Sequence, residues 1–213
     1  MQLVGGADPV VYWLSNFLFD YSMNMASSVL IAVTIALSTT EAISNKWYLL
    51  LMALALYSWA NLGFVYAFQF LFSSPSTGAS MIIVFNGITG VIGLPIFYVV
   101  RFMAKFIDAL KEFEEYIGIL FRCLFPMFNI SNCFMSISDN YRNLESCKDG
   151  CTEENSLCCS YDKCFKACLE RDENYLAWAY PGIGKELVAM IVQGAVCFGF
   201  VFVVDFNLFE KLW

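Results

Sequence analysis

The sequence has no histidine and few charged residues. Among its 213 residues, 15% are Asp, Glu, Lys or Arg, whereas an ordinary soluble domain has ~25%. Without an imidazole, histidine-based catalysis and histidine-ligated metal sites are excluded. The formal net charge of −7 argues against a nucleic-acid partner and leaves no polybasic patch to hold anionic lipids.

Catalytic motifs are missing as well. The stretch Gly182–Glu186 (GIGKE) has the Gly-Lys pair of a phosphate-binding loop. Such a loop also needs Gly at position 179 and Ser or Thr at position 186, where this chain has Ala179 and Glu186. We therefore expect no ATP site, no metal or other cofactor and no catalysis in this chain by itself.

Apolar residues, in contrast, make up 59% of the chain. The stretch Trp47–Phe72 holds no charged side chain. At ~1.5 Å per residue it would form a helix of ~39 Å, longer than the ~30 Å hydrocarbon core of a bilayer. Similar runs predict an all-α, multi-pass membrane protein with four transmembrane helices, three in residues 1–100 (about 10–37, 47–72 and 79–100) and the last in residues 187–213.

The first predicted span carries a polar stripe, which consists of Asn16, Asp20 and Asn24. Residues four apart stack on one helix face. Such a face should meet protein or water, because Asp at mid-bilayer costs ~2.5–3.5 kcal/mol on insertion scales. The stripe is either a substrate-facing or inter-domain surface, or an interfacial anchor with polar packing groups, and we favour the second interpretation.

The third predicted span contains Gly87, Gly90 and Gly93, followed by Pro95. The proline has no N–H to donate to Val91, which predicts a kink or a break there. Glycines let two helices approach closely, so we interpret these positions as packing sites and not as a ligand site.

Residues 101–137 differ from the spans. Apolar residues recur at steps of three and four over Arg101–Phe121, which predicts an amphipathic helix at the membrane interface. The next stretch, Leu124–Ile137, is apolar but too short to span, and it is typical of a re-entrant or interfacial segment. Asn129 begins the formal glycosylation sequon Asn-Ile-Ser.

Residues 138–186 form a predicted cysteine-rich loop between the third and fourth spans. The candidates for disulfide bonds are Cys133, Cys147, Cys151, Cys158, Cys159, Cys164 and Cys168. Disulfides place the loop in an oxidising compartment, on the lumenal or extracellular side. Seven is odd, so one thiol stays free or pairs elsewhere, for example with Cys123. The alternative is a cytosolic zinc site built from two Cys-x3-Cys pairs.

Five segments also resemble a known family. They are residues 8–17 (DPVVYWLSNF, with Asp20), 56–60 (LYSWA), 70–77 (FLFSSPST), 124–126 (LFP) and 175–184 (YLAW, then PGIG). In this order they resemble the second half of the C-terminal membrane domain of ABC transporter subfamily A. The last segment is similar to the branch that contains the lung surfactant lipid exporter. The likeness covers residues 8–100 and 174–212 well and residues 133–173 hardly at all.

The resemblance implies a lipid translocation path for ATP-driven phospholipid or sterol export. It implies membrane lipids, the remaining half-transporter and nucleotide-binding domains as partners, with ATP and magnesium bound on those absent domains. It also implies a fragment whose ends are cytosolic and whose residues 101–186 are lumenal or extracellular. The membrane would be the plasma membrane or an endolysosomal or secretory membrane.

The alternative from another class is a tetraspanin-like four-span organiser with a disulfide-bonded extracellular loop. Its layout of spans and its cysteine-rich second loop are similar. However, Cys158-Cys159 is followed by Ser160, where the Cys-Cys-Gly of that family has glycine.

Overall fold

The computed structural model describes residues 9–37, 44–72, 74–104, 106–148 and 172–205, and all regular structure in them is helical. Four helical stretches are long and apolar enough to cross a membrane. They are α1 (Pro9–Ala36), α3 (Trp47–Phe68) with the short 3-10 turn η2 (Gln69–Leu71), the run α4 (Pro75–Gly87), η3 (Ile88–Gly93) and α5 (Leu94–Ala104), and α8 (Gly184–Asp205). The predicted all-α fold with four membrane-spanning helices is confirmed.

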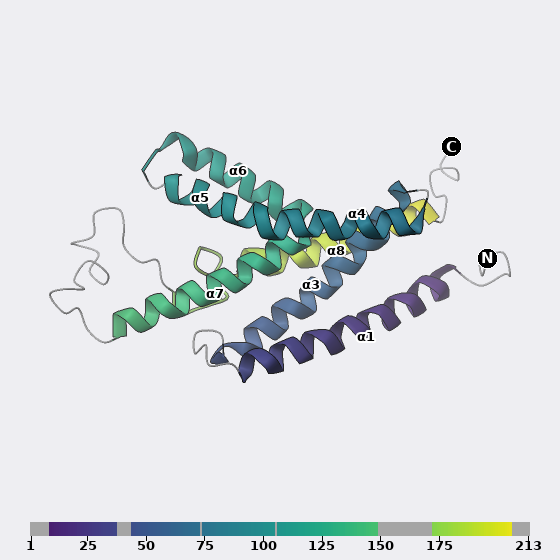
Figure 1. Cartoon of the computed structure of the whole chain (residues 1–213), viewed down its shortest axis with the longest axis horizontal. Coiled ribbons are helices and arrows are strands. Elements are labelled where there is room, and N and C mark those ends of the chain that lie inside the picture. The colour runs from purple at the N-terminus through teal and green to yellow at the C-terminus, as the bar shows by residue number, and fades with distance from the viewer. Residues whose placement is uncertain (1–8, 38–43, 73, 105, 149–171, 206–213) are drawn as a thin grey trace.

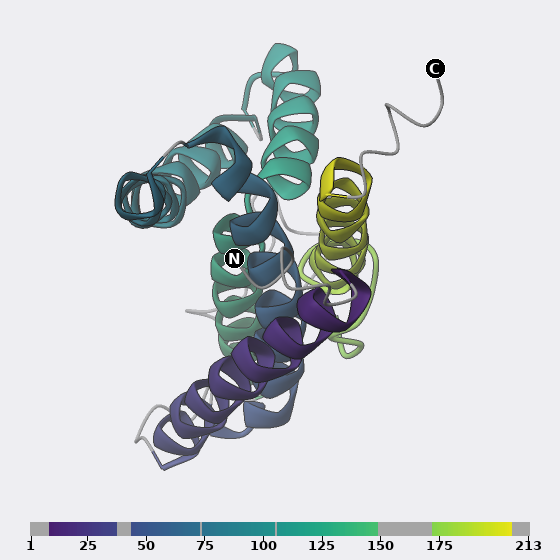
Figure 2. The same ribbon diagram turned by 90° about the vertical axis from the view of Figure 1, so that its right-hand side faces the viewer.

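Helix α3 lies at the centre of the molecule. It contacts α1, α8 and α7 (Pro126–Lys148). Figure 2 shows α3 and α7 between α8 and the stretch from α4 to α5. Leu50, Ala53 and Ala60 of α3 are fully buried. A helix that is apolar on every face can be buried by neighbours all round, which explains why this charge-free stretch forms the core.

Small residues bring α3 and α8 into close contact. A Cβ on Gly194 would lie 2.1 Å from Nε1 of Trp59, and a Cβ on Gly63 would lie 3.1 Å from the Gly194 carbonyl oxygen. The same indole nitrogen donates a hydrogen bond to the Ile191 carbonyl, at 3.2 Å. Close backbone approach of this kind is a usual way in which membrane helices pack.

The third span continues through a π-helical segment. The segment η3 ends at Gly93, two residues before Pro95, so the break predicted at the proline takes the form of a widened turn on its N-terminal side. Gly90 lies in η3, and a Cβ there would be 2.7 Å from Cγ of Met127 in α7. The glycine therefore serves helix packing, as expected.

The structure corrects the prediction of one amphipathic helix over Arg101–Phe121. Helix α5 ends at Ala104, and α6 (Ala109–Leu124) folds back beside it, as Figure 1 shows. The fold-back packs Phe97 against Gly118, where a Cβ would lie 3.2 Å from Cε2 of the phenylalanine. Long-range packing therefore overrides a helical pattern that is continuous in the sequence.

The hairpin of α6 and α7 corrects the predicted start of the loop at residue 138. The two helices meet at a bend of 119°. Phe125 has an extended backbone and Pro126 begins α7, as expected for a residue that precedes proline. Helix α7 then continues past Ile137 to Lys148, because its polar residues Ser136 and Asn140 are buried within the chain.

Candidate functional site

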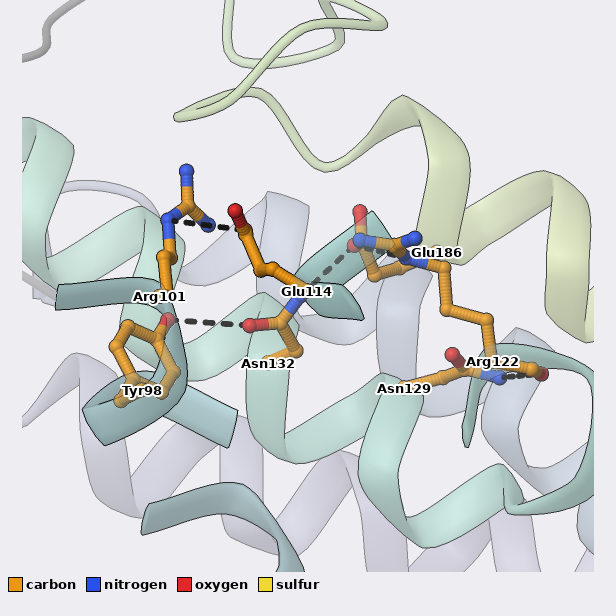
Figure 3. Close-up of polar contacts among 7 residues, drawn as sticks. All are labelled: Tyr98, Arg101, Glu114, Arg122, Asn129, Asn132 and Glu186. Atoms are coloured by element: carbon orange, nitrogen blue, oxygen red, sulfur yellow. Dashed lines mark hydrogen bonds and ion pairs between the residues drawn. The ribbon is translucent and has the colours of Figure 1, made fainter. Parts of the chain in front are cut away.

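An ion pair between the partly buried Arg122 and the buried Glu186 joins the hairpin to the start of α8. Glu186 is 3% exposed, and its Oε1 accepts hydrogen bonds from Nε of Arg122 at 3.1 Å and from Nδ2 of Asn132 at 2.8 Å. The Tyr98 hydroxyl donates to Oδ1 of Asn132, at 3.1 Å. Figure 3 shows this set, which we call the polar junction, and it links α5, α6, α7 and α8.

The helix ends favour both charges of the polar junction. Arg122 is in the last turn of α6 and Glu186 is in the first turn of α8. A helix dipole stabilises a cation at its C-terminus and an anion at its N-terminus. These fields and the hydrogen bond from Asn132 offset part of the cost of removing the two charges from water.

Amide side chains also satisfy backbone carbonyls at the C-terminal end of α6. Nδ2 of Asn129 donates to the Arg122 carbonyl at 2.9 Å, and Nε2 of Gln193 donates to the Cys123 carbonyl at 3.2 Å. The last carbonyls of a helix have no partner within the helix. Residues from α7 and α8 therefore fix the tip of the hairpin.

Three acceptor oxygens of this region have no hydrogen-bond partner in the described part of the chain. They are Oε2 of Glu186, Oδ1 of Asn129 and Oε1 of Gln193, and all three are buried. An unsatisfied buried acceptor costs ~1–3 kcal/mol.

The segment 172–183 is held against the hairpin by its own contacts. The guanidinium carbon of Arg101 lies 3.3 Å from the ring centroid of Tyr180, and Asn140 exchanges two hydrogen bonds with the backbone of Asp172, at 2.8 and 2.9 Å. Tyr175 of this segment is held too, because the ammonium nitrogen of Lys46 lies 4.8 Å from the centroid of its ring. Burial raises the pKa of the Tyr175 hydroxyl.

A groove lies between α6 and α8, beside the polar junction. Its volume is about 390 Å³, and Arg122, Lys185, Glu115 and Trp178 supply its polar lining. A second, apolar pocket of about 220 Å³ lies where α1, α3 and α8 meet, near Phe17. These two cavities differ in their linings, which are charged in the groove and aromatic and aliphatic in the pocket.

The predicted polar stripe turns toward α3 at its centre. Asp20 accepts a hydrogen bond from the Tyr66 hydroxyl, and Nδ2 of Asn24 donates to the Asp20 carbonyl at 3.0 Å. One turn further, the hydroxyls of Ser28 and Ser58 lie 3.5 Å apart. Asn16 is half-buried. Asp20 therefore has a protein partner within this chain.

Of the predicted cysteine and glycosylation sites, the structure describes the side chains of Cys133 and Asn129. Cys133 is a free, fully buried thiol in the core, so the disulfide predicted for it is not shown. Cys147 lies in α7, its side chain is not described, and the other predicted loop cysteines lie outside the described residues. The described residues contain no cluster of metal-ligating side chains. Asn129 is fully buried, which argues against a glycan on the folded chain.

Comparison with known proteins agrees with the four membrane-spanning helices of the fold. The family described as ABC-2 family transporter protein matches residues 1–203. The phospholipid-transporting ATPase ABCA3 of Rattus norvegicus is 26% identical over 215 residues, and the human ABCA3 is 24% identical over 215 residues; both alignments cover 100% of this chain. The human phospholipid-transporting ATPase ABCA7 is 28% identical over 198 residues, which cover 91% of this chain. The chain spans 12% of the length of the ABCA3 proteins and 8% of ABCA7.

Proposed function

The chain belongs to the ABC-2 transporter family, and we propose that it forms part of the lipid translocation path of a subfamily A exporter. It is a multi-pass integral membrane protein and corresponds to the membrane part of such a transporter. This family replaces the tetraspanin-like alternative. The proposed cargo is a phospholipid or a sterol, and the relatives named above are phospholipid-transporting ATPases.

The observation that carries the proposal is the amphipathic helix α6, which exposes apolar side chains and pairs with α8 through polar ones. Phe113, Ile119 and Leu120 of α6 are at least half exposed, while Arg122 pairs with Glu186 on the side that faces α8. In a membrane protein, exposed aromatic and aliphatic side chains belong next to lipid. We propose that the hairpin dips into the lumenal or extracellular leaflet and that the polar junction fixes its position against α8.

Other parts of the transporter would supply the energy. We propose that nucleotide-binding domains hold ATP and magnesium and that a second membrane half completes the path. The chain contributes helices that line the path, and it moves lipid only when those domains drive it. Plasma membrane and endolysosomal or secretory membranes are the proposed locations.

A chimera tests this proposal. The matching segment of the rat ABCA3 protein is replaced by this chain, and the purified chimera is reconstituted in liposomes with a fluorescent phospholipid. We expect lipid movement with ATP and none with a non-hydrolysable analogue. A chimera that is folded and hydrolyses ATP but moves no lipid would contradict the proposal.

A further inference from the structure

We propose that the groove between α6 and α8 binds the headgroup of a zwitterionic glycerophospholipid, with the phosphate at Lys185 and Arg122 and the ammonium at Glu115 and Trp178. This inference deepens the proposed function and rests on it. The volume of about 390 Å³ lies within the range of ~300–1,000 Å³ that is usual for ligand pockets.

The order of side chains along the groove matches a lipid. A hydrogen bond between Gln193 and the Cys123 carbonyl joins α8 to α6. Glu115 lies eight residues before Cys123 in α6, and Lys185 lies eight residues before Gln193 in α8. Eight residues correspond to ~12 Å of helix, and α6 and α8 run in the same direction in Figure 1, so both charged side chains belong to the same end of the groove. Ile119, Val188 and Val192 line the rest, where acyl chains would continue into the membrane.

The phosphate side has free positive charge. Lys185 lines the groove and has no ion-pair partner among the described residues, and Arg122 binds Glu186 through Nε at 3.1 Å. The terminal nitrogens of the guanidinium can therefore donate to a ligand. Lys185 also stands at the N-terminus of α8, where the helix dipole favours an anion.

The ammonium side has a free carboxylate and an aromatic ring. Glu115 is exposed and has no ion-pair partner in the described chain, and the Trp178 side chain is 61% exposed. An ammonium is attracted both to a carboxylate and to the face of an indole ring. A quaternary ammonium is a usual ligand of such an aromatic face.

The balance of charge favours a neutral ligand. The groove and the wall behind it hold Arg122 and Lys185 against Glu115 and Glu186. A lipid with a phosphate alone would leave Glu115 facing negative charge, and a lipid without a phosphate would leave Lys185 unpaired. A zwitterion meets both requirements.

Binding to the full chain in detergent tests the site. Native mass spectrometry measures the affinities of three soluble lipids with the same acyl chains: dioctanoyl phosphatidylcholine, dioctanoyl phosphatidylglycerol and dioctanoyl glycerol. We expect phosphatidylcholine to bind most tightly and dioctanoyl glycerol most weakly. Equal binding of all three would overturn the proposal.

Two substitutions separate the two ends of the headgroup. Lys185→Gln should weaken phosphatidylcholine and phosphatidylglycerol by roughly tenfold each, because a charged hydrogen bond is lost. Glu115→Gln should weaken phosphatidylcholine alone. The matched controls Lys111→Gln and Glu112→Gln, on the exposed surface of α6, should change neither affinity. The site is refuted if Lys185→Gln has no effect or if the controls have equal effects.

The two proposals can fail separately. If the groove of the chain binds lipid but the chimera moves none, the translocation role is refuted and the binding site stands. Lipid movement by the chimera, with phosphatidylcholine affinity unchanged in both groove variants, would refute the site and leave the translocation role intact.

Discussion

The two ends of α8 each hold a carboxylate, and the neighbours of the two carboxylates differ. At the N-terminal end, Glu186 is buried and pairs with Arg122. At the C-terminal end, Oδ2 of Asp205 accepts a hydrogen bond from Nε1 of Trp13, at 2.8 Å. A buried charge needs an opposite charge, whereas a carboxylate that is only half-buried can rely on a neutral donor.

The surroundings of the two ends differ in the same way. The C-terminal end packs through aromatic rings around Phe198, whose centroid lies 4.9 Å from that of Trp59 and 5.0 Å from that of Phe17. Each aromatic pair adds ~0.5–1.5 kcal/mol. Many small contributions hold the aromatic end together, whereas at the N-terminal end a single pair of charges links separate helices beside the apolar core that Leu187 and Met190 join. The polar junction should therefore be the more fragile region.

The largest expected effect is the loss of Glu186. Glu186→Leu leaves the partly buried Arg122 guanidinium without its counter-charge and should lower the free energy of unfolding by ~3 kcal/mol, the low end of the range for a broken buried pair. The double variant Arg122→Leu/Glu186→Leu should lose less, because no unpaired charge remains. SDS-induced unfolding in mixed micelles measures both, with Glu112→Leu on the exposed surface of α6 as the control.

A double variant that is less stable than Glu186→Leu would contradict this account of the junction. It would mean that each side chain makes its own packing contribution, and the contrast with the aromatic end would disappear.

The second effect concerns the contact of α3 with α8, between the two ends. Gly194→Ala places a Cβ on the Trp59 indole and should cost ~1–3 kcal/mol, as overpacking does. Gly199→Ala is the matched control on the same helix, because no atom lies within 4 Å of its added Cβ. Equal unfolding midpoints for the two variants would show that α8 does not pack on α3 in this way.

The sequence predicted the spans because a charge-free run is a local signal, as in Trp47–Phe72. It did not predict the polar junction, because Arg122 and Glu186 are 64 residues apart and nothing in either local pattern specifies the partner. Glu186 was considered only as part of a failed phosphate-loop motif. A charged residue at the start of an apolar span was the one signal that could have suggested a buried partner.

Two boundaries were missed for the same reason. The amphipathic periodicity runs through the turn before α6, where the packing of Phe97 on Gly118 reverses the chain. The polar residues after Ile137 suggested a loop, although Asn140 satisfies its amide on Asp172 and stays in α7. In both cases a distant contact decides the local structure.

The smallest expected effect concerns Asp20, which belongs to the first span and contacts Tyr66 near the aromatic end. Asp20→Leu removes the acceptor of the Tyr66 hydroxyl, which should cost ~1 kcal/mol, while it also removes a carboxylate that is costly in lipid. These two terms oppose each other, so the net change in unfolding free energy should be well below that of Glu186→Leu. Asp20→Asn retains an acceptor and should match the parent chain. If Asp20→Leu, in the same SDS titration, destabilises the chain as much as Glu186→Leu, then the carboxylate at the aromatic end is as essential as the polar junction, and the two ends of α8 do not differ as described.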